Sequence, residues 1–293
     1  MFNSRLGCSS ISFRHQDLST ALRTMTDLGF EEIDLGALPG VCDHVPYELD
    51  LAAVALVAAK VADSGLRVRS VNGDTGDLNA ALDADGEAAR ERHLTALLTL
   101  TAETGAKALV LPCGALSHEP VRNVEEDLDA IAAGLIHAGW RAAGYGVEVW
   151  TESLHFLRFC WNLERAELLA QRLAGSGVGI VMDFSHIVAA GENPVEYLER
   201  HRGRIAHVHL RDAVPGNINI SIGNGNADFA AGLRQLAEQG YTGHFSLELE
   251  TRDVTHDERP AAAAKAGSYI SNLLGTTPSK RHPNYLSQNL GAS

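Results

Sequence analysis

The stretch VGIVMDFSH, residues 178–186, is apolar over its first five positions and then presents Asp183, Ser185 and His186. A continuous apolar run of this length is typical of a strand that is buried on both faces, as in a parallel sheet covered by helices. Titratable groups at the end of such a strand are costly to bury unless something pairs with them. The stretch therefore predicts a parallel strand whose carboxyl end either reaches solvent or lines a site.

Short apolar runs alternate with longer amphipathic segments along the whole chain. The predicted strands are residues 6–10, 32–35, 67–71, 108–111, 146–150, 178–182, 205–209 and 244–247. The predicted helices are residues 18–28, 51–64, 87–104, 124–143, 163–174, 195–200, 229–239 and 261–274. Eight strand–helix units fit a closed (β/α)₈ TIM barrel best. An open doubly wound sheet is the alternative, but no GxGxxG motif follows the first strand and no P-loop lysine is present.

The sequence predicts one domain followed by a short tail. No linker-like change of composition interrupts the alternating pattern before residue 276. Residues 276–293 are polar, contain proline and lack periodicity, which is typical of a chain terminus outside the core. We therefore expect residues 1–275 to form the barrel, as the catalytic domain, and residues 276–293 to form a C-terminal tail.

Composition excludes several classes of partner. The formal net charge of −13 disfavours nucleic acid and anionic membranes, because both require a basic surface. The four cysteines are widely spaced and form no CxxC motif, so neither a thiolate zinc site nor a disulfide framework is expected. No secretory h-region opens the chain and no apolar run is long enough to cross a membrane. We expect a soluble, cytoplasmic protein.

Four consecutive predicted strands end in residues that can bind a metal. In a TIM barrel the active site lies where the strands end, and here the fifth to eighth strands are followed by Glu152, Asp183, His209 and Glu248. One carboxylate at a strand end is usually a helix cap or an ion-pair partner. Four such groups converging without a cation would repel one another. A divalent ion resolves this, and an oxygen-rich set suits Mn²⁺ or Mg²⁺, then Co²⁺, with Zn²⁺ less favoured.

Two of these positions have near neighbours that could replace them. His207 precedes His209 by two residues, and Glu250 follows Glu248 by two residues, so each pair shares one face of its strand. His209 is preferred because it lies nearer the strand end. The spacing alone leaves the choice between Glu248 and Glu250 open.

The second half of the chain resembles a known superfamily. Glu152 followed by MDFSH, HVHLRD, GNGNADF and GYTGHFSLELE resembles the xylose isomerase-like TIM-barrel superfamily. More closely, it resembles the sugar isomerase/epimerase branch, with its tagatose 3-epimerase-like and inosose dehydratase-like enzymes. The resemblance spans most of residues 5–274 and is strongest from residue 147 onward. In that branch GY-x-G precedes a strand ending in Glu, which selects Glu248 over Glu250.

The resemblance implies a metal site and a set of substrate contacts. One divalent ion, expected to be Mn²⁺ with Mg²⁺, Co²⁺ and Zn²⁺ as alternatives, would be bound by Glu152, Asp183, His209 and Glu248. The first and last of these would also act as acid and base. Further polar residues at strand ends or in the loops that follow them are expected to contact the substrate: His186, Arg211, His44, Asn72 and His155.

A site of this kind predicts proton transfer next to a carbonyl. A metal that polarises a carbonyl acidifies the neighbouring C–H group, so that one carboxylate can remove the proton and the other can return it. We therefore expect a metal-dependent ketose or polyol isomerase or epimerase. The alternatives are a lyase or dehydratase, such as an inosose dehydratase-like, dehydroshikimate dehydratase-like or C-glycoside-cleaving enzyme, and a non-catalytic metal- or carbohydrate-binding subunit.

Further expectations concern the substrate and one other branch. The lack of clustered Lys and Arg favours an unphosphorylated carbohydrate, and the sequence leaves open whether the chain forms a homo-oligomer. The superfamily also contains a three-zinc DNA-repair endonuclease branch, which needs additional histidines after strands three and four. Asn72 and Cys113 stand there instead, and the net charge is unsuited to DNA, so this branch is disfavoured.

Overall fold

The computed structural model describes residues 1–276. Within them, eight strands form the sheet that the sequence predicts: β1 (Leu6–Ser9), β2 (Glu32–Ala37), β3 (Arg67–Gly73), β4 (Ala108–Pro112), β5 (Glu148–Glu152), β6 (Gly179–Asp183), β7 (Ile205–Leu210) and β10 (Phe245–Leu247). They pair in parallel in the order β1-β10-β7-β6-β5-β4-β3-β2, and the last strand of this order also pairs with β1. The prediction of a single-domain (β/α)₈ barrel is confirmed.

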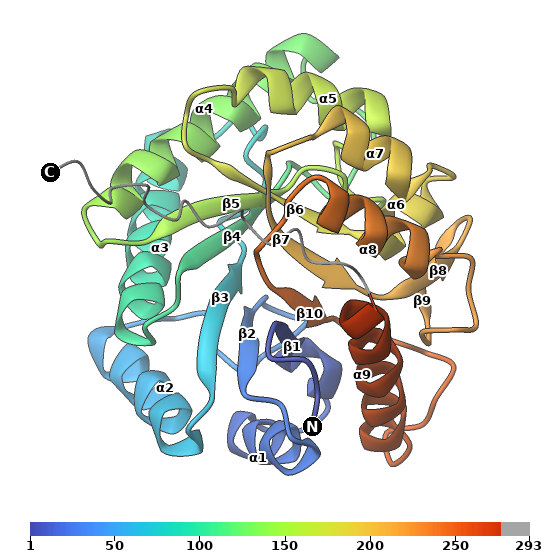
Figure 1. Ribbon diagram of the computed structural model, residues 1–293. Coiled ribbons are helices and arrows are strands. Elements are labelled where there is room, and N and C mark those ends of the chain that lie inside the picture. Colours follow the sequence, from blue (N-terminus) through green and yellow to red (C-terminus); the bar gives the residue numbers. More distant parts are fainter. Residues whose placement is uncertain (277–293) are drawn as a thin grey trace, which may run out of the picture.

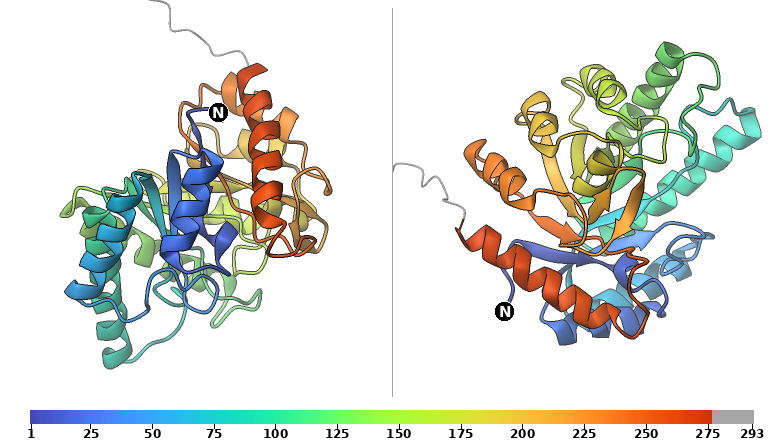
Figure 2. Two further views of the ribbon diagram at one scale, coloured as in Figure 1. Left: turned by 90° about the horizontal axis from the view of Figure 1, so that it is seen from below. Right: turned by 90° about the vertical axis from the view of Figure 1, so that its right-hand side faces the viewer.

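Helices surround this barrel (Figure 1). They are α1 (Leu18–Leu28), α2 (Leu51–Ser64), α3 (Ala84–Glu103), α4 (Val124–Ala143), α5 (Leu163–Arg172), α6 (Phe184–Ala189), α7 (Pro194–Arg200), α8 (Phe229–Glu238) and α9 (Arg259–Thr276), with a 3₁₀ helix η1 (Ser10–Phe13) after the first strand. Figure 2 shows α9 beside the first strand and helix, so the last helix completes the ring next to its beginning.

Local sequence signals explain where the helices begin and end. Asp or Asn side chains accept hydrogen bonds from backbone N–H groups in the first turn of α1, α2, α3, α4 and α5, and these caps are Asp17, Asp50, Asp83, Asn123 and Asn162. Gly29 and Gly65 then end α1 and α2 in the left-handed conformation, with φ of 89° and 73°. The polar caps thus fix where these helices begin, and the two glycines fix where α1 and α2 end before the chain returns to the barrel.

Alternation along the strands places polar groups at the carboxyl end of the barrel. Ala108, Val110, Trp150 and Val181 form a buried cluster inside the barrel. Every second residue of a strand points to the same face. On the face of Trp150 the next residue is therefore Glu152, and on the face of Val181 it is Asp183. This apolar cluster inside the barrel thus ends one layer of side chains below the strand ends, where the polar side chains begin.

Besides η1, a short helix and a β-hairpin between the barrel strands were not predicted. Asp183 ends β6 and its side chain caps α6 directly, a helix too short to show a helical period in the sequence. After β7 the chain forms a hairpin of β8 (Asp212–Val214) and β9 (Asn217–Ile220). The Asp212 carboxylate accepts hydrogen bonds of 2.9–3.0 Å from four backbone N–H groups, those of Ala213, Gly223, Gly225 and Ala227. The glycine-rich GNGNADF stretch therefore folds around one carboxylate.

Other expectations are met within the described residues. All four cysteines are free and buried, in agreement with the prediction of no disulfide framework. Between residues 1 and 276, none of the helices combines the length and the apolar character needed to cross a bilayer. The expected tail lies outside the described residues, apart from Thr276, which ends α9.

Packing between the helices and the barrel leads to a prediction about two helical glycines. A Cβ atom on Gly232 of α8 would lie 2.5 Å from the ring of Phe184, which is fully buried, whereas one on Gly139 of α4 would meet Val178 at an ordinary 3.5 Å. We expect Gly232→Ala to lower the free energy of unfolding by about 1–3 kcal/mol through overpacking. Gly139→Ala should raise it by about 0.5–1 kcal/mol through helix propensity. Urea denaturation measures both, and equal stability of the two variants would contradict tight packing at Phe184.

Candidate functional site

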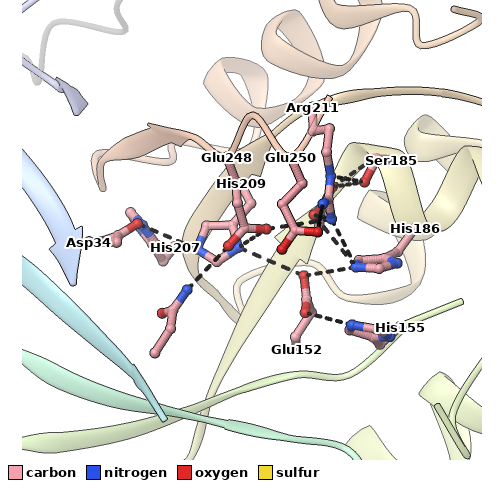
Figure 3. Close-up of polar contacts among 12 residues, drawn as sticks. Asp34, Glu152, His155, Ser185, His186, His207, His209, Arg211, Glu248 and Glu250 are labelled. Carbon is pink, nitrogen blue, oxygen red and sulfur yellow. Dashed lines mark hydrogen bonds and ion pairs between the residues drawn. The ribbon is translucent and has the colours of Figure 1, made fainter. Parts of the chain in front are cut away.

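Four neighbouring strands bring the predicted metal ligands together. Glu152 and Asp183 end β5 and β6, His209 is the penultimate residue of β7, and Glu248 follows β10 directly. One ligand atom of each of the four residues lies within 4.8 Å of the others, and all four residues are buried. In Figure 3, Glu152 lies between His209 and the pair formed by His155 and His186.

His209 lies at the centre of this cluster. Its Nδ1 atom lies 3.7 Å from Oε1 of Glu152 and 3.5 Å from Oε2 of Glu248. The Asp183 carboxylate is fixed by its own helix cap, because Oδ1 accepts hydrogen bonds from the backbone N–H of Ser185 at 2.6 Å and from its hydroxyl at 2.8 Å. The other oxygen of Asp183 is directed at the guanidinium of Arg211, 3.0 Å away.

Burial and mutual repulsion shift the protonation of the cluster. Burial raises the pKa of Glu248 to about 8, against the opposing attraction of His209 and Arg211. Burial likewise raises the pKa of Glu152. Burial alone would lower the pKa of His209, but Glu248, Asp34 and Glu152 together raise it well above its usual range. In the metal-free protein, protons on Glu248, Glu152 and His209 therefore compensate part of the negative charge of the cluster.

The donor set of the cluster fits a divalent cation. Oε1 of Glu152 and both ring nitrogens of His209 are buried and have no hydrogen-bond partner within residues 1–276. Buried polar atoms without partners are uncommon in folded proteins and call for an explanation such as an ion. Three carboxylates and one imidazole provide the oxygen and nitrogen ligands that Mn²⁺, Mg²⁺, Co²⁺ and Zn²⁺ accept.

Arg211 is a buried cation among the acidic groups. Besides its hydrogen bond to Asp183, its Nη2 atom lies 3.5 Å from Oε2 of Glu248, and its Nη1 atom lies 3.6 Å from Oε2 of Glu250. Its Nε donates to the hydroxyl of Ser185 at 2.9 Å. Burial would lower the pKa of Arg211, but these carboxylates raise it, so the guanidinium stays charged. Arg211 therefore offsets part of the negative charge on one side of the cluster.

His155 and His186 form a stacked pair on the other side of Glu152. Their ring centroids lie 3.7 Å apart. The Nε2 atom of each ring lies 3.9 Å from an oxygen of the Glu152 carboxylate. Burial lowers the pKa of both histidines well below the usual value, so both imidazoles are neutral near pH 7.

A cavity of about 230 Å³ opens above the cluster. Its polar part is lined by Glu152, His209, Glu248, His155, His186, Arg211, Asn72, Asp74, Arg158 and Glu250. Asn72 also donates a hydrogen bond of 3.3 Å to Glu248. Its apolar part includes three exposed side chains from different loops, namely Val41, Leu116 and Leu157. The cavity thus combines a polar, partly charged floor with an apolar mouth.

His44 differs from the other predicted substrate residues. Among the described residues, His186, Arg211, Asn72 and His155 line the cavity, whereas His44 does not. Its ring is buried instead between the Gln16 carbonyl, 3.1 Å from Nε2, and the Cys42 thiol, 3.3 Å from Nδ1. The loop after β2 turns the imidazole toward the loop after η1, so the structure does not bring it to the site.

Sequence reasoning missed one charged pair in the cavity wall. Arg158 is buried in the loop after β5, and its Nη2 donates to Oδ2 of Asp74 at 2.7 Å. Its Nη1 also donates to the Gly114 carbonyl at 2.9 Å. Asp74 was detectable as a carboxylate directly after the third strand, but no motif marks an arginine inside a long loop.

Comparisons with curated proteins identify partial relatives. The inosose dehydratase of Clostridium botulinum (strain Alaska E43 / Type E3) is 31% identical over 144 residues, which cover 43% of this chain and 48% of that protein. The rhizopine catabolism protein MocC of Rhizobium meliloti is 27% identical over 200 residues, covering 58% and 59%. The chain therefore matches about half the length of these curated relatives.

Solved structures and a family model cover nearly the whole chain. An L-ribulose 3-epimerase superposes with a TM-score of 0.74 at 20% identity, covering 93% of this chain and 95% of that one. The IOLI protein with a bound zinc atom gives a TM-score of 0.74 at 20% identity, covering 94% and 99%. At this identity the superpositions establish the fold alone. A family model described as xylose isomerase-like TIM barrel matches residues 22–272, and the chain therefore belongs to this family.

Proposed function

We propose that this chain is a divalent-metal-dependent enzyme that moves a proton next to the carbonyl of an unphosphorylated sugar or cyclitol, as an epimerase or isomerase. The observation that carries the proposal is the convergence of Glu152, Asp183, His209 and Glu248 beneath a cavity large enough for a small carbohydrate. The epimerase with the same fold is consistent with this reaction class.

The same four residues would hold the ion. When bound, the ion supplies Lewis-acid chemistry, because it polarises a carbonyl oxygen and so acidifies the adjacent C–H group. Mn²⁺ is the expected ion on the basis of the three carboxylates. Zn²⁺ is the first alternative, since a protein of the same fold binds a zinc atom.

Glu152 and Glu248 would carry the proton. They come from β5 and β10, which are separated in the barrel by β6 and β7, so their carboxylates approach the cluster from different sides. A base on one side and an acid on the other can remove a proton and return it on the opposite face or at the next carbon. Both residues line the cavity, as acid–base groups must.

The remaining polar groups would bind and orient the substrate. Arg211 is an N–H donor beside the cluster, placed to hold a hydroxyl group or a developing enediolate oxygen. His186, whose Nε2 accepts a hydrogen bond from Arg211, lines the same cavity and would contact the substrate beside it. The Arg158–Asp74 pair in the cavity wall provides a donor and an acceptor for more distant hydroxyls. The apolar mouth would contact C–H faces of the sugar and limit access of water.

A dehydratase is the second candidate, and the partial identity to inosose dehydratase favours it. Dehydration begins with the same proton abstraction, after which the second carboxylic acid protonates a departing hydroxyl β to the carbonyl. A panel of ketoses and keto-inositols separates the two candidates. Epimerisation or isomerisation conserves the substrate mass, whereas dehydration releases one water and forms a conjugated enone.

Metal content is the first test of this proposal. Protein purified without chelator, or reconstituted with Mn²⁺ after chelator treatment, should bind about one divalent ion per chain, and removal of the ion should abolish turnover. Metal analysis and calorimetric titration measure the stoichiometry. Absence of any ion, with none taken up on addition of Mn²⁺, Mg²⁺, Co²⁺ or Zn²⁺, would sink the proposal.

Substitution of Glu248 tests the proton transfer itself. Glu248→Gln keeps the shape of the side chain but cannot accept a proton, so exchange of solvent deuterium into the substrate should fall by about 10²-fold or more. Glu103→Gln, an exposed site at the end of α3, is the matched control and should exchange at the wild-type rate. NMR of the recovered sugar measures the exchange. Unchanged exchange in Glu248→Gln refutes its acid–base role, and binding without turnover in wild type would indicate a non-catalytic subunit.

A further inference from the structure

A buried carboxylate outside the cluster, that of Asp34, also faces the ring of His209. Asp34 lies in β2, which β1 and β10 separate from β7 in the barrel, and is fully buried. Its Oδ2 atom lies 3.4 Å from Nε2 of His209, while the opposite ring nitrogen faces Glu152 and Glu248. The imidazole therefore lies between Asp34 on one side and the carboxylate cluster on the other (Figure 3).

Asp34 is itself held firmly in place. Oδ1 accepts a hydrogen bond of 2.8 Å from the hydroxyl of Ser70, its neighbour in the β2–β3 register. Oδ2 accepts a hydrogen bond of 2.8 Å from Nε2 of His207. The His207 ring in turn stacks on Trp150 of the apolar cluster inside the barrel, with ring centroids 5.5 Å apart. Hydrogen bonds from Ser70 in β3 and His207 in β7 thus fix the orientation of the Asp34 carboxylate without an ion.

Asp34, His207 and His209 also have the geometry of a separate metal-binding group. Neutral imidazole has one nitrogen with a free lone pair, because the other carries a proton. His209 therefore cannot ligate an ion in the upper cluster through Nδ1 and a second ion beside Asp34 through Nε2. His207 already donates a hydrogen bond to Asp34, so hydrogen bonding explains the contacts among Asp34, His207 and His209 better than a second ion does.

We infer that Asp34 is a positioning residue that holds the Nε2–H group of His209 and thereby aims the lone pair of Nδ1 at the metal centre. At 3.4 Å the contact between Nε2 and Oδ2 is long for a hydrogen bond, so the inference requires the ring to shift slightly toward Asp34 when it takes up its ligand role. This inference rests on the proposed metal site. Carboxylates that accept the second N–H of a ligating histidine fix its tautomer and raise its basicity.

The inference predicts a loss of metal affinity on removal of the charge of Asp34. Asp34→Asn keeps the side-chain shape, and its dissociation constant for Mn²⁺ should rise by about 10- to 100-fold. Asp127→Asn is the matched control, because Asp127 is equally buried, accepts hydrogen bonds from Asn79 and Arg122, and neither lines the cavity nor belongs to the cluster. Its Mn²⁺ affinity should equal that of wild type. Titration calorimetry with Mn²⁺ alone measures the dissociation constant of the wild type and of both variants. Circular dichroism checks that each protein is folded.

Ser70→Ala provides a milder variant that keeps the charge of Asp34 and removes one of its anchors. Its Mn²⁺ affinity should fall by only about 2- to 10-fold, because the charge that faces His209 remains and one of the two anchors of Asp34 is lost. In ¹⁵N spectra of the Zn²⁺-loaded wild-type protein, Nε2 of His209 should carry the proton. Wild-type affinity in both folded variants, or a proton on Nδ1, overturns the role of Asp34 and leaves the metal site intact. A wild-type protein that binds no ion refutes the proposed function and this inference with it.

Discussion

Mutual repulsion among Glu152, Asp183 and Glu248 is the constraint on which the rest of the site depends. Three buried carboxylates converge on one imidazole, and they would move apart if their backbones were free to do so. The barrel prevents this, because the backbone ladder fixes Asp183 opposite His209 in the β6–β7 register and the N–H of Glu248 donates to the carbonyl of Leu210. The stability of the closed sheet is therefore what keeps a costly charge arrangement in place.

Much of this arrangement could be predicted from the sequence because barrel strands obey simple periodicities. The buried strand at residues 178–182 and the groups at the strand ends led to the four clustered residues, since parallel strands end at one edge. Loops follow no such rule. His44 and Arg158 both lie in loops, and only the folded chain shows that one points away from the cavity and the other lines it. Helix α6 was missed because six residues are too few to display a helical period.

The polar floor and the apolar mouth of the cavity serve different parts of the chemistry. Epimerisation, isomerisation and dehydration all begin with proton abstraction beside a carbonyl, so the floor suits each of them equally. The choice among them depends on how the substrate is held, which is decided by the loops that supply Leu116, Leu157 and the Arg158–Asp74 pair.

Asp212, directly after Arg211, organises the loop that follows β7 through four backbone hydrogen bonds. A Cβ atom on Gly225 would lie 2.2 Å from one of the Asp212 carboxylate oxygens, so the loop can close only because residue 225 has no side chain. The two positions are therefore coupled in space, because a side chain at residue 225 would displace the carboxylate that holds the loop. Grafting this loop onto another barrel requires that both residues be transferred together.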